Sequence, residues 1–414
     1  MFDELFKRTA AVVRHTAAPL LVERLLYLEH LRDVGSAHKT LIRYADGMLC
    51  IGEMLRWTLP NPITTEQVEA AVDRWITRRH SRKIPGHATK IALRCTARGW
   101  FRFLGLLQAN VDNHPGSEQI EAYARFMLEE RNLSPVTVRA RCGHAAEFLR
   151  LLAEQGRDVV GFGWRDVDQI LVFKGRQEGL TRSSMQTYTY DLRNFVRFLE
   201  DRHHCLPGLA AAIRPGRVYQ GEQLPMGPSW DVVCRLLDAM QGETDSVVRD
   251  RAIMMLFALY GLRASEVQRL SLDDFDWENA IIRVHRSKQC ARVECYPLAH
   301  PTAQALATYI RSVRPKTDRR EVFLQMRAPY LPLSTSALWQ VVSRRLRPMD
   351  PGLRHHGPHA LRHACATRLL ARGMSMKEIG DFLGHRHPST TAVYAKVDLH
   401  GLRRVADVDL RRFL

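Results

Sequence analysis

Two stretches rich in turn-forming residues most constrain how this chain of 414 residues can fold. The first, QANVDNHPGS at residues 108–117, is short and polar. The second spans residues 206–228 and contains four glycines together with Pro207, Pro215, Pro225 and Pro228. Because proline and glycine disfavour regular structure, both stretches predict linkers. The chain is therefore expected to divide into blocks at 1–107, 118–205 and 229–414.

The first two blocks resemble each other. Segments 31–55 and 128–152 each contain a small-residue break followed by an amphipathic helix. Near the end of each block come the matching sequences RGWFRFL (98–104) and RNFVRFL (193–199). The near-constant offset predicts a duplicated helical unit, although any two amphipathic helices share such periodicity.

Basic residues lie between the apolar positions of these blocks. Examples are Arg139, Arg141, Arg182, Arg193 and Arg197. The whole chain carries a formal charge of +17, so a polyanion is the first partner to consider. A helix with an apolar stripe and a basic opposite face can contact phosphates, although any single arginine is more often only solvated.

The third block predicts a mixture of helices and strands. Helices are expected at 250–260, from Ala264, and at 301–313, 334–346, 360–372 and 376–383, with a short one after Ser389. The segment at 273–298 alternates and carries β-branched residues, which predicts two or three antiparallel strands with a turn near 287–292. The fold class is therefore mainly α, with a small antiparallel sheet in the third block.

Composition excludes several classes of protein. No apolar run approaches the roughly 18 residues that cross a bilayer, and the acidic N-terminus does not resemble a signal peptide. Eight cysteines without a CxxC pair indicate reduced thiols rather than a disulfide framework. We therefore expect a soluble, cytoplasmic protein.

Four short segments of the third block combine residues suited to phosphate chemistry. They contain Arg263, Lys288, the pair His359 and Arg362, and His385 followed nine residues later by Tyr394. His359 and Arg362 would share one helix face, and His385 follows the helix-ending Gly384. Cationic groups around one phenol are suited to cleaving a phosphodiester. Guanidinium groups can bind two phosphate oxygens at once, and they stabilise the negative charge that develops on these oxygens during attack on phosphorus. Each of these residues alone has an ordinary structural explanation.

The joint order of these residues resembles the tyrosine recombinase (phage integrase) family. Its diagnostic segments are similar to GLRASEVQRL (261–270), HALRHACATRLLARG (359–373) and LGHRHPSTTAVYAKV (383–397). The resemblance covers 229–414, which would be the catalytic domain, and 118–205 looks like the family's core-binding domain. Residues 1–107 exceed the minimal two-domain plan and are expected to form an extra, DNA-binding-like helical domain.

The resemblance implies a role for each candidate residue. Tyr394 would be the nucleophile that forms a 3′-phosphotyrosyl bond. The nonbridging oxygens would be held by Arg263, Arg362 and His385, while Lys288 would protonate the departing 5′ oxygen. His359 would assist proton transfer from the tyrosine, and Glu266 would orient its neighbours. The resemblance implies that the protein acts on double-stranded DNA as a tetramer on paired sites, or in an assembly with related recombinases, with neither ATP nor a metal cofactor. We expect it in the cytoplasm, associated with the nucleoid.

Other functions share parts of this pattern. A type IB topoisomerase would use the same residues to relax supercoils, and a catalytically silent DNA-binding regulator would share the basic charge. A metal site on His359, His363, His385 and His387 is disfavoured by the arginine neighbours, and His363 is expected to serve helix packing. The apolar spacing in 402–414 predicts a helix that either docks on a neighbouring subunit, as the family resemblance implies, or folds back on its own domain. The sequence does not specify the DNA target or the type of recombination.

Overall fold

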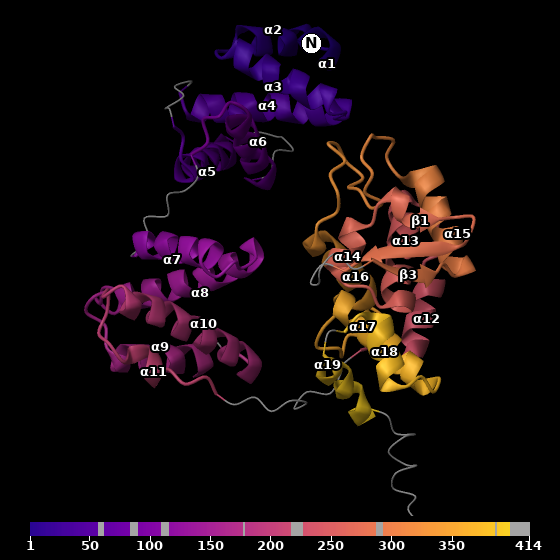
Figure 1. The fold of residues 1–414 in the computed structure, drawn as a ribbon. Coiled ribbons are helices and arrows are strands. Elements are labelled where there is room, and N and C mark those ends of the chain that lie inside the picture. Colours follow the sequence, from indigo (N-terminus) through magenta and orange to yellow (C-terminus); the bar gives the residue numbers. More distant parts are fainter. Residues whose placement is uncertain are drawn as a thin grey trace, which may run out of the picture. The chain divides into compact units, whose positions relative to one another are not determined.

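The computed structural model describes residues 1–56, 62–82, 90–108, 116–176, 179–216, 227–286, 293–385 and 387–397. The described chain is mainly helical with one small sheet, as expected (Figure 1). Within this described part, no helix has both the length and the apolar character that a membrane span requires.

Six helices form the N-terminal part of the chain: α1 (Phe2–Leu5), α2 (Thr9–Ala17), α3 (Leu21–Asp33), α4 (His38–Met54), α5 (Thr65–Arg82) and α6 (Lys90–Phe103). Helix α4 packs against α6, whose Trp100 and Phe101 are fully buried. Gly47 of α4 allows this close approach, because a Cβ there would lie 3.0 Å from the Thr96 side chain. Trp100 and Phe101 of the sequence RGWFRFL therefore belong to the core, whereas Phe103 is 40% exposed.

Five helices form a compact unit with a core of its own: α7 (Ser117–Glu129), α8 (Pro135–Glu154), α9 (Trp164–Arg176), α10 (Arg182–Asp201) and α11 (Leu209–Ala212). Ser134 and Thr181 cap the starts of α8 and α10, because each side chain accepts a hydrogen bond from a backbone N–H of the first turn. Phe148 and Phe195 are fully buried between these helices. Helix α8 packs on α10, and in the N-terminal part α4 packs on α6.

The linker expected at 206–228 is only partly irregular. Helix α11 occupies Leu209–Ala212, where the sequence predicted no regular structure, so that part of the prediction is wrong. Leu209, Ala210 and Ile213 are buried in the core around α10, and this packing stabilises a single helical turn despite the neighbouring prolines. Residues 217–226, and the stretch 109–115 of the shorter linker, lie outside the described residues.

The C-terminal part combines helices with a three-stranded antiparallel sheet. Its helices are α12 (Trp230–Asp238), α13 (Asp245–Tyr260), α14 (Ala264–Arg269), α15 (His300–Thr308), α16 (Thr335–Leu346), α17 (Pro358–Ala371), α18 (Met376–Leu383) and α19 (Pro388–Ala392). A 3-10 helix, η3 (Val393–Val397), follows α19 directly. The strands are β1 (Phe275–Asp276), β2 (Ile281–His285) and β3 (Val293–Pro297), paired in the order β1-β2-β3.

This arrangement confirms the predicted elements of the third block. Helix α13 runs through the core and ends at Gly261, which adopts the left-handed conformation with φ of 57°. Ser375 and Glu378 form a capping box at the start of α18. Strands β2 and β3 pair antiparallel, with Val284 opposite Glu294, and the turn between them (287–292) lies outside the described residues.

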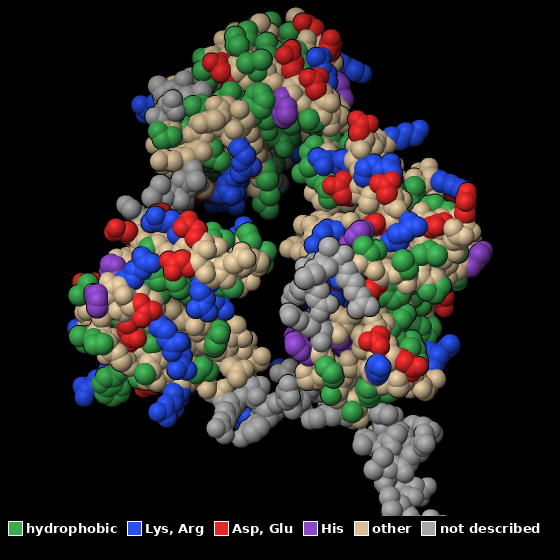
Figure 2. All heavy atoms as spheres, viewed as in Figure 1, with side chains coloured by type: hydrophobic (Ala, Val, Ile, Leu, Met, Phe, Trp, Pro, Cys, Tyr) green, Lys and Arg blue, Asp and Glu red, His purple; other side chains and the backbone are tan. Residues whose placement is uncertain are grey.

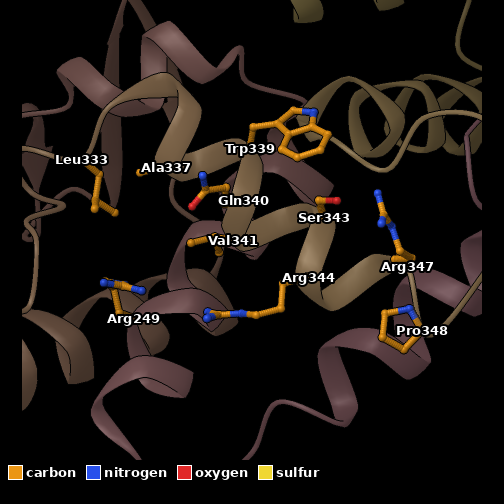
Figure 3. A pocket seen from close by; sticks show the side chains of 10 residues that line it. All are labelled: Arg249, Leu333, Ala337, Trp339, Gln340, Val341, Ser343, Arg344, Arg347 and Pro348. Atoms are coloured by element: carbon orange, nitrogen blue, oxygen red, sulfur yellow. The ribbon is translucent and has the colours of Figure 1, made fainter. Parts of the chain in front are cut away.

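A buried carboxylate joins α13 to α16. Asp250 is fully buried, and its oxygens lie 2.8 Å from the guanidinium groups of Arg249 and Arg344 and 3.0 Å from that of Arg345. Figure 3 shows Arg249 and Arg344 beside the same cavity of about 490 Å³, with Arg347 farther along α16. Asp250 therefore neutralises arginines that would otherwise repel one another between the two helices.

Replacing Asp250 with alanine should lower the free energy of unfolding by about 3–5 kcal/mol, because it leaves the buried guanidinium group of Arg249 without its carboxylate. Urea unfolding measures this change. The control is Asp273→Ala, which removes an exposed carboxylate paired with Arg320 and should change stability little. Equal stabilities of the two variants would contradict the role assigned to Asp250.

Candidate active site

The site begins where α13 ends. Gly261 is required at this turn for two reasons: its φ is positive, and a Cβ would lie 2.6 Å from Leu383 of α18. Its carbonyl oxygen accepts a hydrogen bond from Nη1 of Arg362 in α17. Nη2 of the same guanidinium donates to the Leu383 carbonyl at 2.6 Å. Arg362 thus holds the ends of α13 and α18 together.

Burial affects the charge of Arg362 without removing it. Its side chain is 3% exposed. Desolvation, followed by repulsion from Arg263, lowers the pKa of the guanidinium to about 10. Arg362 therefore stays protonated at neutral pH, as a fixed cation in a dry site.

Arg263 reaches the same turn from the start of α14. Its Nη2 donates to the Gly384 carbonyl at 2.9 Å, next to the carbonyl that Arg362 contacts, and its Nη1 donates to Glu266 at 2.8 Å. The two guanidinium groups predicted from the sequence therefore converge on Leu383 and Gly384, two consecutive residues. Glu266 has the expected orienting position, since it also accepts a hydrogen bond from the Arg263 backbone N–H at 2.8 Å.

Arg286 is a further cation that sequence analysis missed. It follows β2, is 6% exposed, and its Nη1 donates to the second oxygen of Glu266 at 2.8 Å. It also contacts Glu294, the Tyr296 hydroxyl and the Phe382 carbonyl. The strand pattern does not distinguish Arg286 from an exposed arginine. The only sequence signal for a role in the site was its position just before the predicted turn.

Glu266 remains ionised between these arginines. Burial raises the pKa of its carboxyl, but the charge of Arg286 and hydrogen bonds from Arg263 and Arg286 outweigh this effect and hold the pKa below its usual value. An ionised carboxylate with 0% exposure thus fixes two guanidinium groups. Its loss would leave Arg263 without its carboxylate and Arg286 with Glu294 alone.

His385 is positioned by the turn that ends α18. Gly384 adopts φ of 64°, and a Cβ there would lie 2.7 Å from the Arg286 guanidinium, so glycine is required. The Nδ1 atom of His385 lies 2.7 Å from the Thr391 hydroxyl of α19. Burial, followed by the charges of Arg362 and Arg263, lowers the pKa of His385 to about 4.

Tyr394 lies in η3 and is 2% exposed. Its ring packs against Cys365, Ile379 and Leu383. Burial raises the pKa of its hydroxyl to about 12, and the Arg362 charge opposes this shift only in part. Its hydroxyl oxygen lies 2.9 Å from Nδ1 of His363 in α17. His363, for which the sequence predicted helix packing, thus contacts the tyrosine, because the turn of α19 and η3 brings Tyr394 back onto α17.

The remaining sequence candidates are His359, Lys288 and the segment 402–414. His359 is exposed and lines a groove of about 960 Å³ together with Arg263 and His363. The same groove reaches Thr335, Ser336, Trp339 and Gln340 of α16. Lys288 and the segment 402–414 lie outside the described residues. Among the described residues, no group of three or more histidine, cysteine or acidic side chains is arranged to hold a metal ion.

Acid should destabilise the fold through two of these histidines. In an unfolded chain a histidine has a pKa of about 6.5, whereas burial lowers the pKa of His363 and of His385 to about 4. Between these values the unfolded state binds more protons, so the free energy of unfolding should fall as pH decreases from about 6.5 toward 4. Urea titrations at several pH values measure this slope. A doubly substituted His363→Gln, His385→Gln protein should lose less stability over that window, and an unchanged slope would contradict the assignment.

Known proteins resemble this chain in sequence and in fold. The protein-family model described as "Phage integrase family" matches residues 229–400, and the family model described as "Phage integrase, N-terminal SAM-like domain" matches residues 120–203. A putative integrase/recombinase of Sinorhizobium fredii, y4rA, is 34% identical over 303 residues, which cover 72% of this chain and 73% of the relative. Tyrosine recombinase XerC of Alcanivorax borkumensis is 29% identical over 302 residues, covering 72% of this chain and 94% of the relative.

Two solved structures resemble the fold. Lambda integrase, as a dimer bound to a core site, aligns with a TM-score of 0.51 at 17% identity, over 67% of this chain and 94% of that chain. XerH site-specific recombinase, bound to its palindromic substrate, aligns with a TM-score of 0.51 at 16% identity, over 87% of this chain and 95% of that chain. At these identities the likeness concerns the fold.

Proposed function

Because the chain belongs to the phage integrase (tyrosine recombinase) family, we propose that it is a site-specific DNA recombinase that cleaves and rejoins DNA strands. Tyr394 attacks a DNA phosphate and forms a 3′-phosphotyrosyl intermediate, while the 5′ oxygen departs. The covalent bond conserves the energy of the phosphodiester, so rejoining requires no ATP. The relatives described above are integrases and recombinases, and the topoisomerase alternative has no comparable support.

One observation carries this proposal: two fixed guanidinium groups converge on the turn that ends α18, and one of them acts on the tyrosine. Arg263 and Arg362 are held on consecutive carbonyl groups, and the Arg362 charge acts on the Tyr394 hydroxyl. In bonds among the described residues, each guanidinium uses two of its five N–H donors, which leaves three for phosphate oxygens. Donors fixed in advance stabilise the charge that develops on phosphorus oxygens without reorganising during the reaction.

The other candidate residues complete this mechanism. His385 donates to a nonbridging oxygen from Nε2, since its Nδ1 is occupied by Thr391. Glu266 orients Arg263 and Arg286. Lys288, on the segment after β2, protonates the departing 5′ oxygen. His359 lines the groove with Arg263 and assists proton transfer there.

The helices of the first two blocks hold the DNA. Arg139, Arg182 and Arg197 are exposed on α8 and α10, and Figure 2 shows Lys and Arg side chains over the drawn face of α7–α11. Counterion release from phosphates favours such binding. We assign 118–205 as the core-binding domain, to which the packed turn of α11 also belongs, the rest of 206–228 as linker, 229–414 as catalytic domain and 1–107 as a duplicated DNA-binding domain. The protein assembles as a tetramer on paired sites in the cytoplasm, at the nucleoid, with 402–414 docking on a neighbouring subunit.

A nicked duplex library of randomised sequence tests the proposal. The nick lets the short 5′-hydroxyl strand diffuse away after cleavage, so the protein stays attached to the DNA. Adducts that survive denaturing detergent are isolated and their DNA is sequenced. We expect adducts enriched in one sequence with a constant cleavage position. Specific DNA binding without any adduct would favour a catalytically silent regulator, and supercoil relaxation without sequence preference would favour a topoisomerase.

A further inference from the structure

The Tyr394 hydroxyl has a histidine partner to which sequence analysis gave no chemical role. Nδ1 of His363 lies 2.9 Å from the hydroxyl oxygen, and the two ring centroids are 5.6 Å apart. His359, which the family resemblance implied for proton transfer, lies one helical turn earlier on α17, and its ring centroid is 6.0 Å from that of His363. The histidine in direct contact with the phenol is therefore His363.

The Tyr394 hydroxyl needs a proton acceptor if it is to attack phosphorus. Burial holds its pKa near 12, so the phenol is protonated at neutral pH. As the oxygen bonds to phosphorus it becomes far more acidic, and the proton must leave in the same step. An acceptor within hydrogen-bond distance of the phenol lowers the barrier to that step.

His363 is in the protonation state that an acceptor requires. The titratable and charged groups around it are His359 and Arg362 of α17, His355 of the preceding loop and Tyr394 of η3. Burial and the first three of these groups lower the pKa of His363 to about 4, so its ring is neutral at pH 7. A phosphate bound beside Arg362 would offset the positive charge there and strengthen the histidine as a base.

We propose that His363 is the general base of strand cleavage: its Nδ1 accepts the phenolic proton while the Tyr394 oxygen bonds to phosphorus. This role rests on the proposed recombinase function. The bond between phosphorus and the 5′ oxygen breaks in the same step, and that oxygen takes its proton from a separate acid, for which we proposed Lys288. In rejoining, the 5′ hydroxyl displaces the tyrosine oxygen, and the imidazolium of His363 returns the proton to it. His363 must therefore carry its own proton on Nε2 before cleavage.

A purely structural role for the same hydrogen bond makes a different prediction. A positioning residue would alter the rate by the same factor at every pH, whereas a base would alter the dependence on pH itself. His363→Asn separates the two roles, because its amide can occupy the place of Nδ1 as a hydrogen-bond partner but cannot accept a proton. His363→Ala removes both functions.

The experiment measures the single-turnover rate of adduct formation on the nicked duplexes selected above, between about pH 6 and pH 9. The wild-type rate should vary little over this range. His363→Asn and His363→Ala should react about 10²-fold more slowly at pH 7, and their rates should rise about tenfold per pH unit, as the fraction of free phenolate does. Added imidazole should partly restore His363→Ala. The control is His300→Ala, at the exposed start of α15, which should match the wild type.

Two results would overturn the general-base role while leaving the recombinase function standing. One is a His363→Asn protein with the wild-type rate and pH profile. The other is a profile lowered in parallel at every pH, which indicates positioning alone. If His363→Ala unfolds, the His363→Asn profile decides the question. A wild-type protein that forms no adduct on any selected duplex would instead overturn the recombinase function, and with it this role.

Discussion

A Tyr394→Phe protein should form no covalent adduct with DNA and exchange no strands. The substitution removes one oxygen, the atom that is expected to bond to phosphorus. The ring would still pack against Cys365, Ile379 and Leu383, so the fold and DNA binding should persist. Adduct formation on nicked duplexes and an electrophoretic binding assay measure the two properties separately.

The nearest structural control for this change is Tyr260→Phe. Tyr260 is also buried, but its hydroxyl donates to the Pro297 carbonyl and accepts from the Ala299 N–H, away from the proposed chemistry. Its loss should affect stability and leave adduct formation in place. If Tyr394→Phe still exchanged strands, the nucleophile would have to be another residue.

Replacing Arg362 with alanine should slow adduct formation by about 10³-fold or more, since one fixed guanidinium commonly contributes that much to phosphoryl transfer. The same change removes the hydrogen bonds to the Gly261 and Leu383 carbonyls, so stability must be measured in parallel. Arg362→Lys retains a positive charge but cannot contact both carbonyls and a phosphate in the same way. It should fold better than alanine and remain strongly impaired.

Arg368→Ala provides a matched control on the same helix. Its guanidinium lies 5.3 Å from the Trp230 ring centroid, on the packing surface with α12 rather than at the turn of α18. We expect its adduct rate to stay within a few fold of the wild type. An Arg362→Ala protein that folds and reacts as fast as this control would exclude Arg362 from transition-state stabilisation.

Much of the third block could be predicted from its sequence because local signals agree there with tertiary packing. Gly261 and Gly384 end helices where a left-handed residue is needed, and the two ends meet through Arg362. The spacing of His359 and Arg362 correctly placed both on α17 but could not show which neighbouring histidine faces the tyrosine. That depends on where the α19–η3 turn returns to α17, a contact across 31 residues.

The residues missed by sequence analysis share a physical reason. Arg286 is buried because two carboxylates pair with its guanidinium group. Glu266 is far from it in the sequence, and Glu294 lies on the neighbouring strand β3. Similarly, the single turn of α11 is stabilised by the apolar surface of α10 and not by its own sequence. Local sequence patterns indicate the propensity of a segment to form a helix or a strand. The burial of Arg286 and the formation of α11 depend instead on contacts between distant segments.

The most direct test of the account is peptide mapping of the trapped adduct by mass spectrometry. After nuclease and protease digestion, a nucleotide should remain attached through phosphorus to the peptide that contains Tyr394, with a free 5′ hydroxyl on the released strand. Attachment to any other side chain, or a 5′-linked nucleotide on Tyr394, would contradict the proposed chemistry.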